Sequence, residues 1–175
     1  GRSFDAAKNT SWRKQPVQIQ SVQAAIEAGG SKLRAWARYL DENHDLAIGV
    51  LDVLVANICP LTVQPMVRRK NGKPAETINK QIAELWDDWI KAPEVTGQMS
   101  FAEVQRIACR AWLRDGEVLL QHIVGDRLDL DHNTEVPYAI AMIESDYLPY
   151  DMIDADNIMS GIETNAWGRP VAYYL

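Results

Sequence analysis

The acidic residues in the last third of the chain are the first candidates for chemistry. Residues 116–175 carry eleven Asp and Glu side chains against two arginines. Carboxylates that converge in a folded protein can hold two metal ions and cleave a phosphodiester, so a metal-dependent nuclease is one hypothesis. The spacing of the acids neither supports nor excludes it, because acids on loops are commonly solvated.

A short acidic run imitates the start of a calcium loop. Asp129, Asp131 and Asn133 have the spacing of the first three ligands. Thr134 stands where the loop needs its turn glycine, and Ile140 stands where it needs its bidentate glutamate. We therefore expect no calcium site.

The other residue types that commonly do chemistry show no working arrangement. His44, His122 and His132 are far apart in the sequence and lack the spacing of a zinc site. Cys59 and Cys109 lie in apolar helical contexts, which favours buried thiols over a disulfide or a metal site. The chain has neither a glycine-rich phosphate loop nor a serine in a nucleophile elbow. We expect no catalytic residue, no metal and no cofactor.

Positive charge is concentrated near the start of the chain and in one turn. Residues 1–40 hold seven Lys and Arg against two acids, although the net charge of the chain is -6. The run Arg68-Arg69-Lys70-Asn71-Gly72-Lys73 surrounds an Asn-Gly pair that is typical of a tight turn. Basic clusters can contact nucleic acid or an acidic protein, and they can equally be solvated surface. The candidate contacts for DNA or a partner are Arg13, Lys14, Arg34, Arg38, Arg68, Arg69 and Lys70.

Hydrophobic periodicity predicts five helices that would position these residues. The last is the best defined, because Ser100 and Glu103 form a capping-box pattern and Asp115-Gly116 supplies a C-terminal stop. The predicted helices cover residues 17–28 with a stop at Gly29-Gly30, 31–43 with Ser31 as N-cap, 45–59 ending before Pro60, 75–92 ending before Pro93, and 100–115.

Two of these helices differ in how much of their surface is apolar. In residues 31–43, Leu33, Trp36 and Leu40 form a narrow apolar stripe, and the arginines point elsewhere. Residues 45–59 are apolar nearly all round. A helix of that kind must be covered on most sides, either by a central core or, in an oligomer, by a neighbouring subunit.

Strands are predicted after the last helix. They cover residues 117–124, 136–143, 158–163 and 170–175, with a hairpin connection at 164–169, while 61–67 is an edge strand at best because of Pro65. The fold class is α+β, with amphipathic helices packed on a small antiparallel sheet. We expect a basic flexible arm over residues 1–16 and one α+β domain over 17–175, which stops inside a strand and suggests a fragment of a larger chain.

The composition is that of a globular protein, with 47% hydrophobic and 24% charged residues. No apolar run approaches the ~20 residues that cross a bilayer, and the first residues lack the layout of a signal peptide. The sequence predicts a soluble intracellular protein.

Five short blocks occur in a fixed order between residues 33 and 175. The blocks are Leu33-Arg34 and Arg38-Tyr39-Leu40 with Asn43; Trp86 with Trp89; Val104-Gln105-Arg106 through Asp115-Gly116-Glu117-Val118-Leu119; Met142-Ile143-Glu144-Ser145-Asp146-Tyr147-Leu148; and Gly161-Ile162-Glu163 followed by Gly168-Arg169-Pro170-Val171-Ala172-Tyr173. In this order they resemble the lambda-like portal proteins of tailed bacteriophages, in the outer wing region. The clearest family-motif residues are Asp115, Gly116, Glu117, Gly168, Arg169 and Pro170.

The resemblance implies a structural protein rather than an enzyme. It implies a homo-oligomeric ring of about a dozen subunits with cyclic symmetry, placed at one vertex of the virion capsid and assembled in the host cytoplasm. The implied partners are the major capsid protein, the terminase large subunit, head-tail connector proteins, and double-stranded DNA that passes through the channel without sequence specificity. No membrane is implied.

The chain also departs from the family pattern. Cys59-Pro60 stands where the family has Val-Gly, and Asp41 or Glu42 stands where it has a second arginine. Two alternative functions stay open: a metal-dependent DNA-processing enzyme that uses the C-terminal acids, and a monomeric head-completion or scaffold module.

Overall fold

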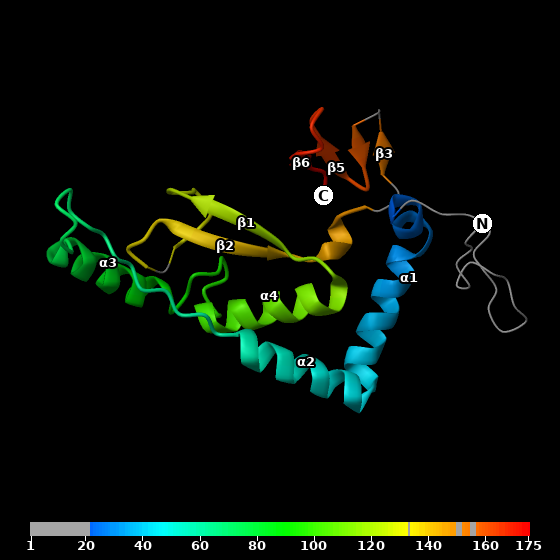
Figure 1. Cartoon of the computed structure of the whole chain (residues 1–175), viewed down its shortest axis with the longest axis horizontal. Helices are drawn as coiled ribbons and strands as arrows, with labels where there is room; N and C mark the ends of the chain where they lie inside the picture. Colours follow the sequence, from blue (N-terminus) through cyan, green and yellow to red (C-terminus); the bar gives the residue numbers. More distant parts are fainter. Residues whose placement is uncertain (1–21, 133, 150–151, 155–156) are drawn as a thin grey trace, which may run out of the picture.

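Four helices precede two antiparallel sheets in the part of the chain that the structure describes, residues 22–132, 134–149, 152–154 and 157–175 of a computed structural model (Figure 1). The helices are α1 (Val22–Asn43), α2 (Asp45–Ile58), α3 (Glu76–Trp89) and α4 (Phe101–Asp115). The strands are β1 (Leu119–Val124), β2 (Tyr138–Ile143), β3 (Ile153–Asp154), β4 (Ile158–Met159), β5 (Ile162–Thr164) and β6 (Pro170–Tyr173). This mixture confirms the predicted α+β class.

Helix α1 runs through a pair of glycines without a break. The predicted stop at Gly29-Gly30 and the predicted N-cap at Ser31 are therefore wrong, because one helix extends from Val22 to Asn43. Gly29 does not have the positive φ of a C-terminal cap, since glycine permits that conformation without requiring it. A helix-interior glycine costs about 1 kcal/mol relative to alanine, a penalty that packing elsewhere along a helix can override.

Helix α4 begins and ends where the sequence predicts. The Ser100 hydroxyl accepts the backbone N–H of Glu103, and the Glu103 carboxylate accepts the backbone N–H of Ser100 at 2.7 Å, which completes a capping box. Gly116 closes the helix in the left-handed conformation with φ 86°. The chain then enters β1 at Leu119, after Glu117 and Val118.

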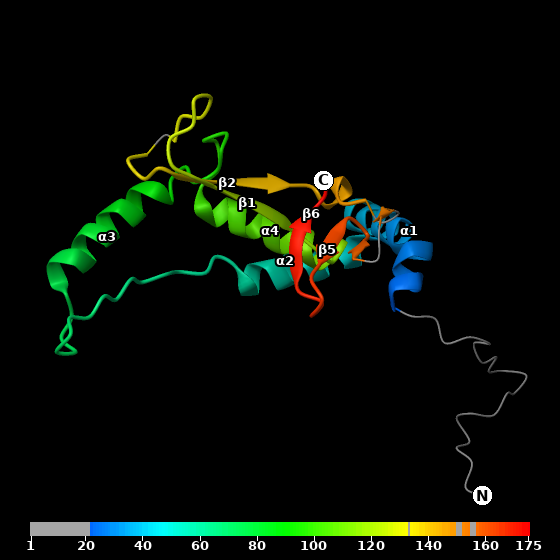
Figure 2. The ribbon, with the colours of Figure 1, turned by 90° about the horizontal axis from the view of Figure 1, so that it is seen from above.

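The segment between α2 and α3 is extended but forms no strand. The expected edge strand at 61–67 is absent among the described residues, because side-chain amides take the place of a partner strand. Gln105 accepts from the N–H of Leu61 at 2.7 Å and donates to its carbonyl at 3.2 Å. Asn79 clamps Val67 in the same two-sided way. The segment therefore runs extended to the basic turn at 68–73 (Figure 2) and is held by side-chain hydrogen bonds at both of its ends.

The strands form two separate sheets. β1 pairs with β2 from Leu119 opposite Ile143 to Val124 opposite Tyr138, and the second sheet has the order β3-β4-β5-β6. The predicted single strand at 158–163 is wrong, because a turn at Ser160-Gly161 splits it into β4 and β5. Both residues have positive φ, 51° and 72°, and a Cβ on Gly161 would lie 2.9 Å from a Pro149 side-chain carbon.

The buried core is small and divided. Val55, Cys59 and Cys109 pack between α2 and α4, and both cysteines are buried free thiols, as predicted. A second cluster is aromatic: Trp89 contacts Trp86, Phe101 and Tyr138, with ring centroids 5.2 to 5.5 Å apart. Among the described residues, more large apolar side chains are exposed than are buried, so this part of the chain does not enclose its own apolar surface.

In the described part of the chain, no helix is both long enough and apolar enough to span a membrane.

Candidate interaction site

Helix α1 buries its charged face and exposes its apolar face. Arg34 and Asp41 are 7% and 8% exposed, whereas Leu33 and Trp36 are 69% and 63% exposed. The apolar stripe and the arginines lie on different faces of the helix, as the periodicity predicts, and it is the arginine face that packs inward. Residues 34, 38 and 41 have helical spacing and face the other elements of the chain, where carboxylates receive them.

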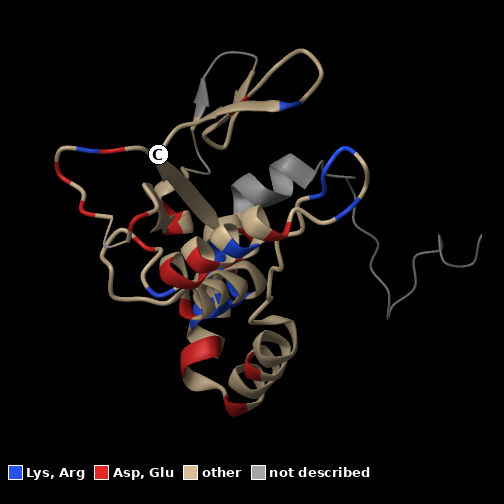
Figure 3. Ribbon diagram, turned by 90° about the vertical axis from the view of Figure 1, so that its left-hand side faces the viewer, with Lys and Arg blue, Asp and Glu red and all other residues tan. Residues whose placement is uncertain are grey.

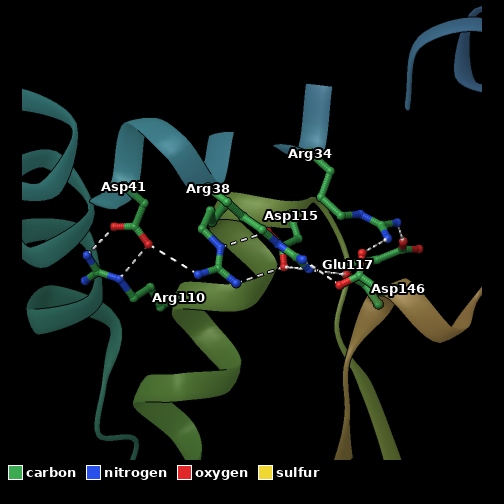
Figure 4. Close-up of polar contacts among 9 residues, drawn as sticks. Arg34, Arg38, Asp41, Arg110, Asp115, Glu117 and Asp146 are labelled. Atoms are coloured by element: carbon green, nitrogen blue, oxygen red, sulfur yellow. Dashed lines mark hydrogen bonds and ion pairs between the residues drawn. The ribbon is translucent and has the colours of Figure 1, made fainter. Parts of the chain in front are cut away.

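Two arginines of α1 are held by acids from the end of α4 and from the segments next to β1 and β2 (Figure 4). Arg34 donates to Glu117 at 2.6 Å and to Asp146 at 3.2 Å. Arg38 donates to both oxygens of Asp115, at 3.2 and 3.0 Å, and to Asp146 at 2.5 Å. Asp146 lies in a short 3-10 turn, Ser145–Tyr147, directly after β2, and therefore joins both arginines.

The network continues toward α2. Asp41 of α1 accepts two hydrogen bonds from Arg110 of α4, and Arg110 also donates to Asp52 of α2 at 2.5 Å. Arg114, one helical turn further along α4, donates to Asp41 at 3.4 Å and to Asp115 at 2.8 Å. We call these residues the arginine–carboxylate network: Arg34, Arg38, Asp41, Asp52, Arg110, Arg114, Asp115, Glu117 and Asp146.

Every carboxylate with a resolved pKa shift in the network is held in its charged form. Burial acts to raise the pKa of Asp115, but hydrogen bonds from Arg114 and Arg38 outweigh it and lower that pKa to about 2. Hydrogen bonding from Arg110 lowers the pKa of Asp41. For Asp146, hydrogen bonds from Arg38 and Arg34 outweigh burial and lower the pKa. Asp41, Asp115 and Asp146 are therefore held as carboxylates that neutralise the arginines.

The network has the chemistry of a structural joint. An acid that is held ionised by arginines serves poorly as a general acid, and its lone pairs are occupied. Among the described residues, no group of three or more His, Cys, Asp or Glu side chains is placed to hold a metal ion. A pocket of about 470 Å³ borders the network, and its charged lining includes the paired residues Arg38, Arg114 and Asp115. These charges join α1, α2 and α4 to the start of β1 and to the turn after β2.

The structure separates the predicted basic contacts into two groups. Arg34 and Arg38 belong to the network, so each would have to leave its carboxylate partners in order to bind a phosphate. Their role as contacts for DNA or a partner stays a prediction. Arg69 and Lys70 are exposed in the turn between α2 and α3, and Arg68 donates to the Gly72 carbonyl of the same turn at 3.2 Å.

Three other predictions concern residues that the structure does not describe. Arg13 and Lys14 lie outside the described residues, as do the arm at 1–16 and Asn133 of the imitation calcium loop.

Sequence reasoning missed most of the acids and two of the arginines in the network. Asp41, Asp146, Arg110 and Arg114 were not chosen as functional residues, although Asp146 lies in a family block. The spacing of Arg34, Arg38 and Asp41 at i, i+4 and i+7 was a usable signal, because it places three charges on one helix face.

The family-motif residues near the end of the chain form a rigid hairpin tip. Gly168 has φ 73°, and the Asn165 side chain accepts the N–H groups of Trp167 and Arg169 at 2.9 and 3.1 Å. Pro170 then opens β6. This tip presents Trp167 to solvent with 93% of its surface exposed.

Charge is also divided between opposite sides of the molecule. Figure 3 shows the basic turn at 68–73 on one side and the acidic connection between β1 and β2 on the other. Across the same molecule, the outer surfaces of α1 and α2 are apolar: Leu46, Val50 and Val53 of α2 are 76%, 59% and 62% exposed. The arrangement offers several contact surfaces and one internal joint.

The comparison with protein families gives one match. The family model described as phage portal protein, lambda family, matches residues 7–175, while no curated protein matches the chain. The matched region contains the whole arginine–carboxylate network and the hairpin tip. Because the match covers nearly the whole sequence, the chain belongs to the lambda family of phage portal proteins.

Proposed function

We propose that this chain is a wing region of a portal ring. The family is structural, and its members belong to the capsid of the virion as oligomeric rings. In this proposal, about a dozen subunits related by cyclic symmetry surround a channel at one capsid vertex. DNA enters through it during packaging and leaves during ejection. The terminase large subunit, the major capsid protein and head-tail connector proteins dock on the ring, which assembles in the host cytoplasm.

The observation that carries the proposal is the uncovered apolar surface of α1 and α2. A helix with the composition of α2 needs cover on most sides, yet Val55 is its one buried residue. The outward side chains of α1, such as Trp36, extend this surface. A neighbouring subunit in a ring supplies the missing cover.

The arginine–carboxylate network gives the subunit a constant shape. A ring closes only if each subunit presents its two interfaces at a fixed angle. Arg38, Asp115 and Asp146 join α1 to the end of α4 and to the turn after β2, and Arg110 joins α4 to both α1 and α2. The function is thus geometric: ion pairs set the angles between the elements, and apolar faces join the subunits.

The basic turn at 68–73 is the proposed contact for DNA or an acidic partner surface. Arg69 and Lys70 are exposed at its tip, and no ion pair joins either of them to an acid in the described part of the chain. Exposed cations of this kind bind phosphates without reading sequence. A contact of this kind suits a channel protein through which any DNA sequence must pass.

Electron microscopy of the purified full-length protein tests the proposed function. A ring with a central hole is the expected result. A lone molecule that cleaves DNA with Mg²⁺ or Mn²⁺, and loses the activity through single Asp substitutions, would contradict the proposal in favour of a nuclease. A monomer that binds only to preassembled heads would contradict it in favour of a head-completion module.

A further inference from the structure

The hairpin between β5 and β6 holds a tryptophan in solvent on a preorganised tip. Four hydrogen bonds close the tip around Asn165: its side chain accepts two N–H groups, its carbonyl accepts the N–H of Gly168 at 2.8 Å, and its own N–H donates to Arg169 at 2.9 Å. Trp167 is nevertheless 93% exposed. A large aromatic side chain on a rigid tip loses little conformational entropy on binding, and tryptophan is enriched among the residues that contribute most to interface affinity.

A preformed apolar pocket lies at the other end of the chain fold, between α3 and the start of β2. It has a volume of about 310 Å³ and is lined by Ile82, Leu85, Trp86, Trp89, Val136 and Tyr138. Its floor is rigid, because the Trp89 indole N–H donates to the Tyr138 carbonyl at 2.8 Å and the two rings are in contact. The volume admits an indole ring.

The charges beside the tryptophan and beside the pocket are complementary. Arg169 follows Trp167 by two residues and is exposed, and within the described part of the chain no acid is paired with its guanidinium. An acidic cleft that includes Glu84, Asp88 and Glu135 adjoins the pocket, with Leu85 in the wall of both. Glu84 pairs with Lys80 and Asp88 pairs with Lys91, and both ion pairs are exposed. Exposed ion pairs are weak, so the cleft keeps most of its negative potential.

The tryptophan and the pocket are separated within one molecule. The β5–β6 hairpin lies well away from α3 in two perpendicular views (Figures 1 and 2). We propose that Trp167 of one copy of this chain inserts into the α3 pocket of the next copy, with Arg169 on the acidic cleft beside it. This inference rests on the proposed ring function and names one contact between its subunits.

The contact joins two different patches, so it is heterologous. Such a contact leaves one free tryptophan and one free pocket at the ends of any open chain of subunits, and only a closed ring satisfies all of them. A contact between identical patches would instead stop at a dimer. The difference between these two outcomes can be measured directly.

The first experiment measures self-association of the chain by sedimentation velocity. Trp167→Ala removes the anchor and keeps the pocket, whereas Leu85→Glu keeps the anchor and places a charge in the pocket wall. Each is expected to weaken self-association roughly 30-fold or more. An equimolar mixture of the two variants retains one intact contact and is expected to form heterodimers that grow no further.

Two matched variants control for general effects of the substitutions. Leu128→Ala removes a fully exposed apolar side chain from another loop. Ile78→Glu adds the same charge to α3 at a position that is similarly exposed and does not line the pocket. Both controls are expected to associate like the wild-type chain, and unchanged thermal unfolding shows that each variant folds.

Three results would overturn the contact: association of Trp167→Ala at the wild-type level, failure of the mixture to form heterodimers, or a wild-type chain that stays monomeric at its highest soluble concentration. A second measurement identifies the occupant of the pocket. A photoreactive phenylalanine at position 167, in a mixture of isotopically light and heavy chains, is expected to give mixed-isotope cross-links to residues 82–89 or 136–138. Cross-links elsewhere would assign Trp167 to another partner surface.

The failure of this inference is distinguishable from the failure of the proposed function. If the full-length protein forms rings and Trp167→Ala forms equally stable rings, the named contact is wrong and the ring stands. If the wild-type full-length protein forms no ring, the proposed function itself is wrong.

Discussion

Arg38 and Asp115 form a two-point pair in which Nε donates to Oδ1 at 3.2 Å and Nη2 donates to Oδ2 at 3.0 Å. The pair joins α1 to the last residue of α4, and Asp115 also accepts from Arg114. The Asp115 side chain is only 3% exposed, so the loss of one of its partners leaves a poorly solvated charge and is costly. Arg38 is therefore fixed against the point at which α4 turns into the first sheet.

Substitution of Asp115 by asparagine is expected to destabilise the chain. Asp115→Asn keeps the shape of the side chain but leaves Arg38 and Arg114 without their shared anion, which costs about 2–3 kcal/mol of unfolding free energy. Urea denaturation followed by circular dichroism measures this cost. Asp126→Asn removes an equal charge from an exposed loop position and should change stability by less than about 0.5 kcal/mol. Equal effects of the two substitutions would contradict a structural role for the network.

The network also predicts a loss of stability in acid. The pKa of Asp115 is about 2 in the folded chain, below the unfolded value of about 3.9, so its contribution is fully present above about pH 4. As the pH falls toward 2, the unfolded state takes up a proton before the folded state does, and roughly 2 kcal/mol is lost. Asp41 and Asp146, whose pKa values are also lowered, add to the loss.

Unfolding free energies measured between pH 6 and pH 2 test this expectation. The Asp115→Asn variant should show a flatter pH dependence than the wild-type chain over the same interval. A parallel dependence in the two proteins would assign acid sensitivity to other groups.

The elements that local chemistry determines could be predicted from the sequence. The capping box at Ser100 and Glu103, the left-handed Gly116 and the periodicity of α3 depend on residues within one or two helical turns of each other. The turn at Ser160-Gly161 and the continuity of α1 were missed. Both errors involve glycine, which is compatible with a helix, a helix cap or a turn. The immediate neighbours of the glycine do not determine which of these conformations it adopts.

The spacing of the charged residues of α1 shows that they share one face, but the sequence does not show that this face points inward, because distant residues determine it. Arg34 meets Glu117 and Asp146, which are 83 and 112 residues away in the sequence. Hydrophobic periodicity assigns the apolar stripe to the core, a rule that assumes that one chain encloses its own core. Leu33 and Trp36 are exposed in this chain, and in the proposed ring the same rule would select the interface between subunits instead.

Two glycine substitutions test the continuity of α1. Gly29→Ala should stabilise the chain by about 1 kcal/mol, because Gly29 lies inside the helix and a Cβ there meets no atom within 4 Å. Gly116→Ala should destabilise it by about 1 kcal/mol, because alanine is strained at φ 86°. Thermal unfolding measures both changes. If Gly29→Ala instead lowered the melting temperature as Gly116→Ala does, Gly29 would be a C-cap and α1 would be two helices.

The two groups of predicted arginine contacts should respond differently to DNA. The exposed side chains of Arg69 and Lys70 can each neutralise one phosphate, so the double variant Arg69→Ala/Lys70→Ala should weaken binding to duplex DNA for every sequence. The slope of log affinity against log salt should become less steep by about 2. Fluorescence anisotropy over a salt series measures both quantities, with Lys80→Ala/Lys91→Ala as the control that removes equal charge from α3 and the residues after it.

Arg34→Met, by contrast, should lower the unfolding free energy and leave the salt dependence of DNA binding unchanged, because the Arg34 guanidinium is buried against Glu117. If Arg34→Met made the dependence of log affinity on log salt less steep while the turn variant bound DNA like the wild-type chain, the nucleic-acid contact would lie on α1 and not on the turn.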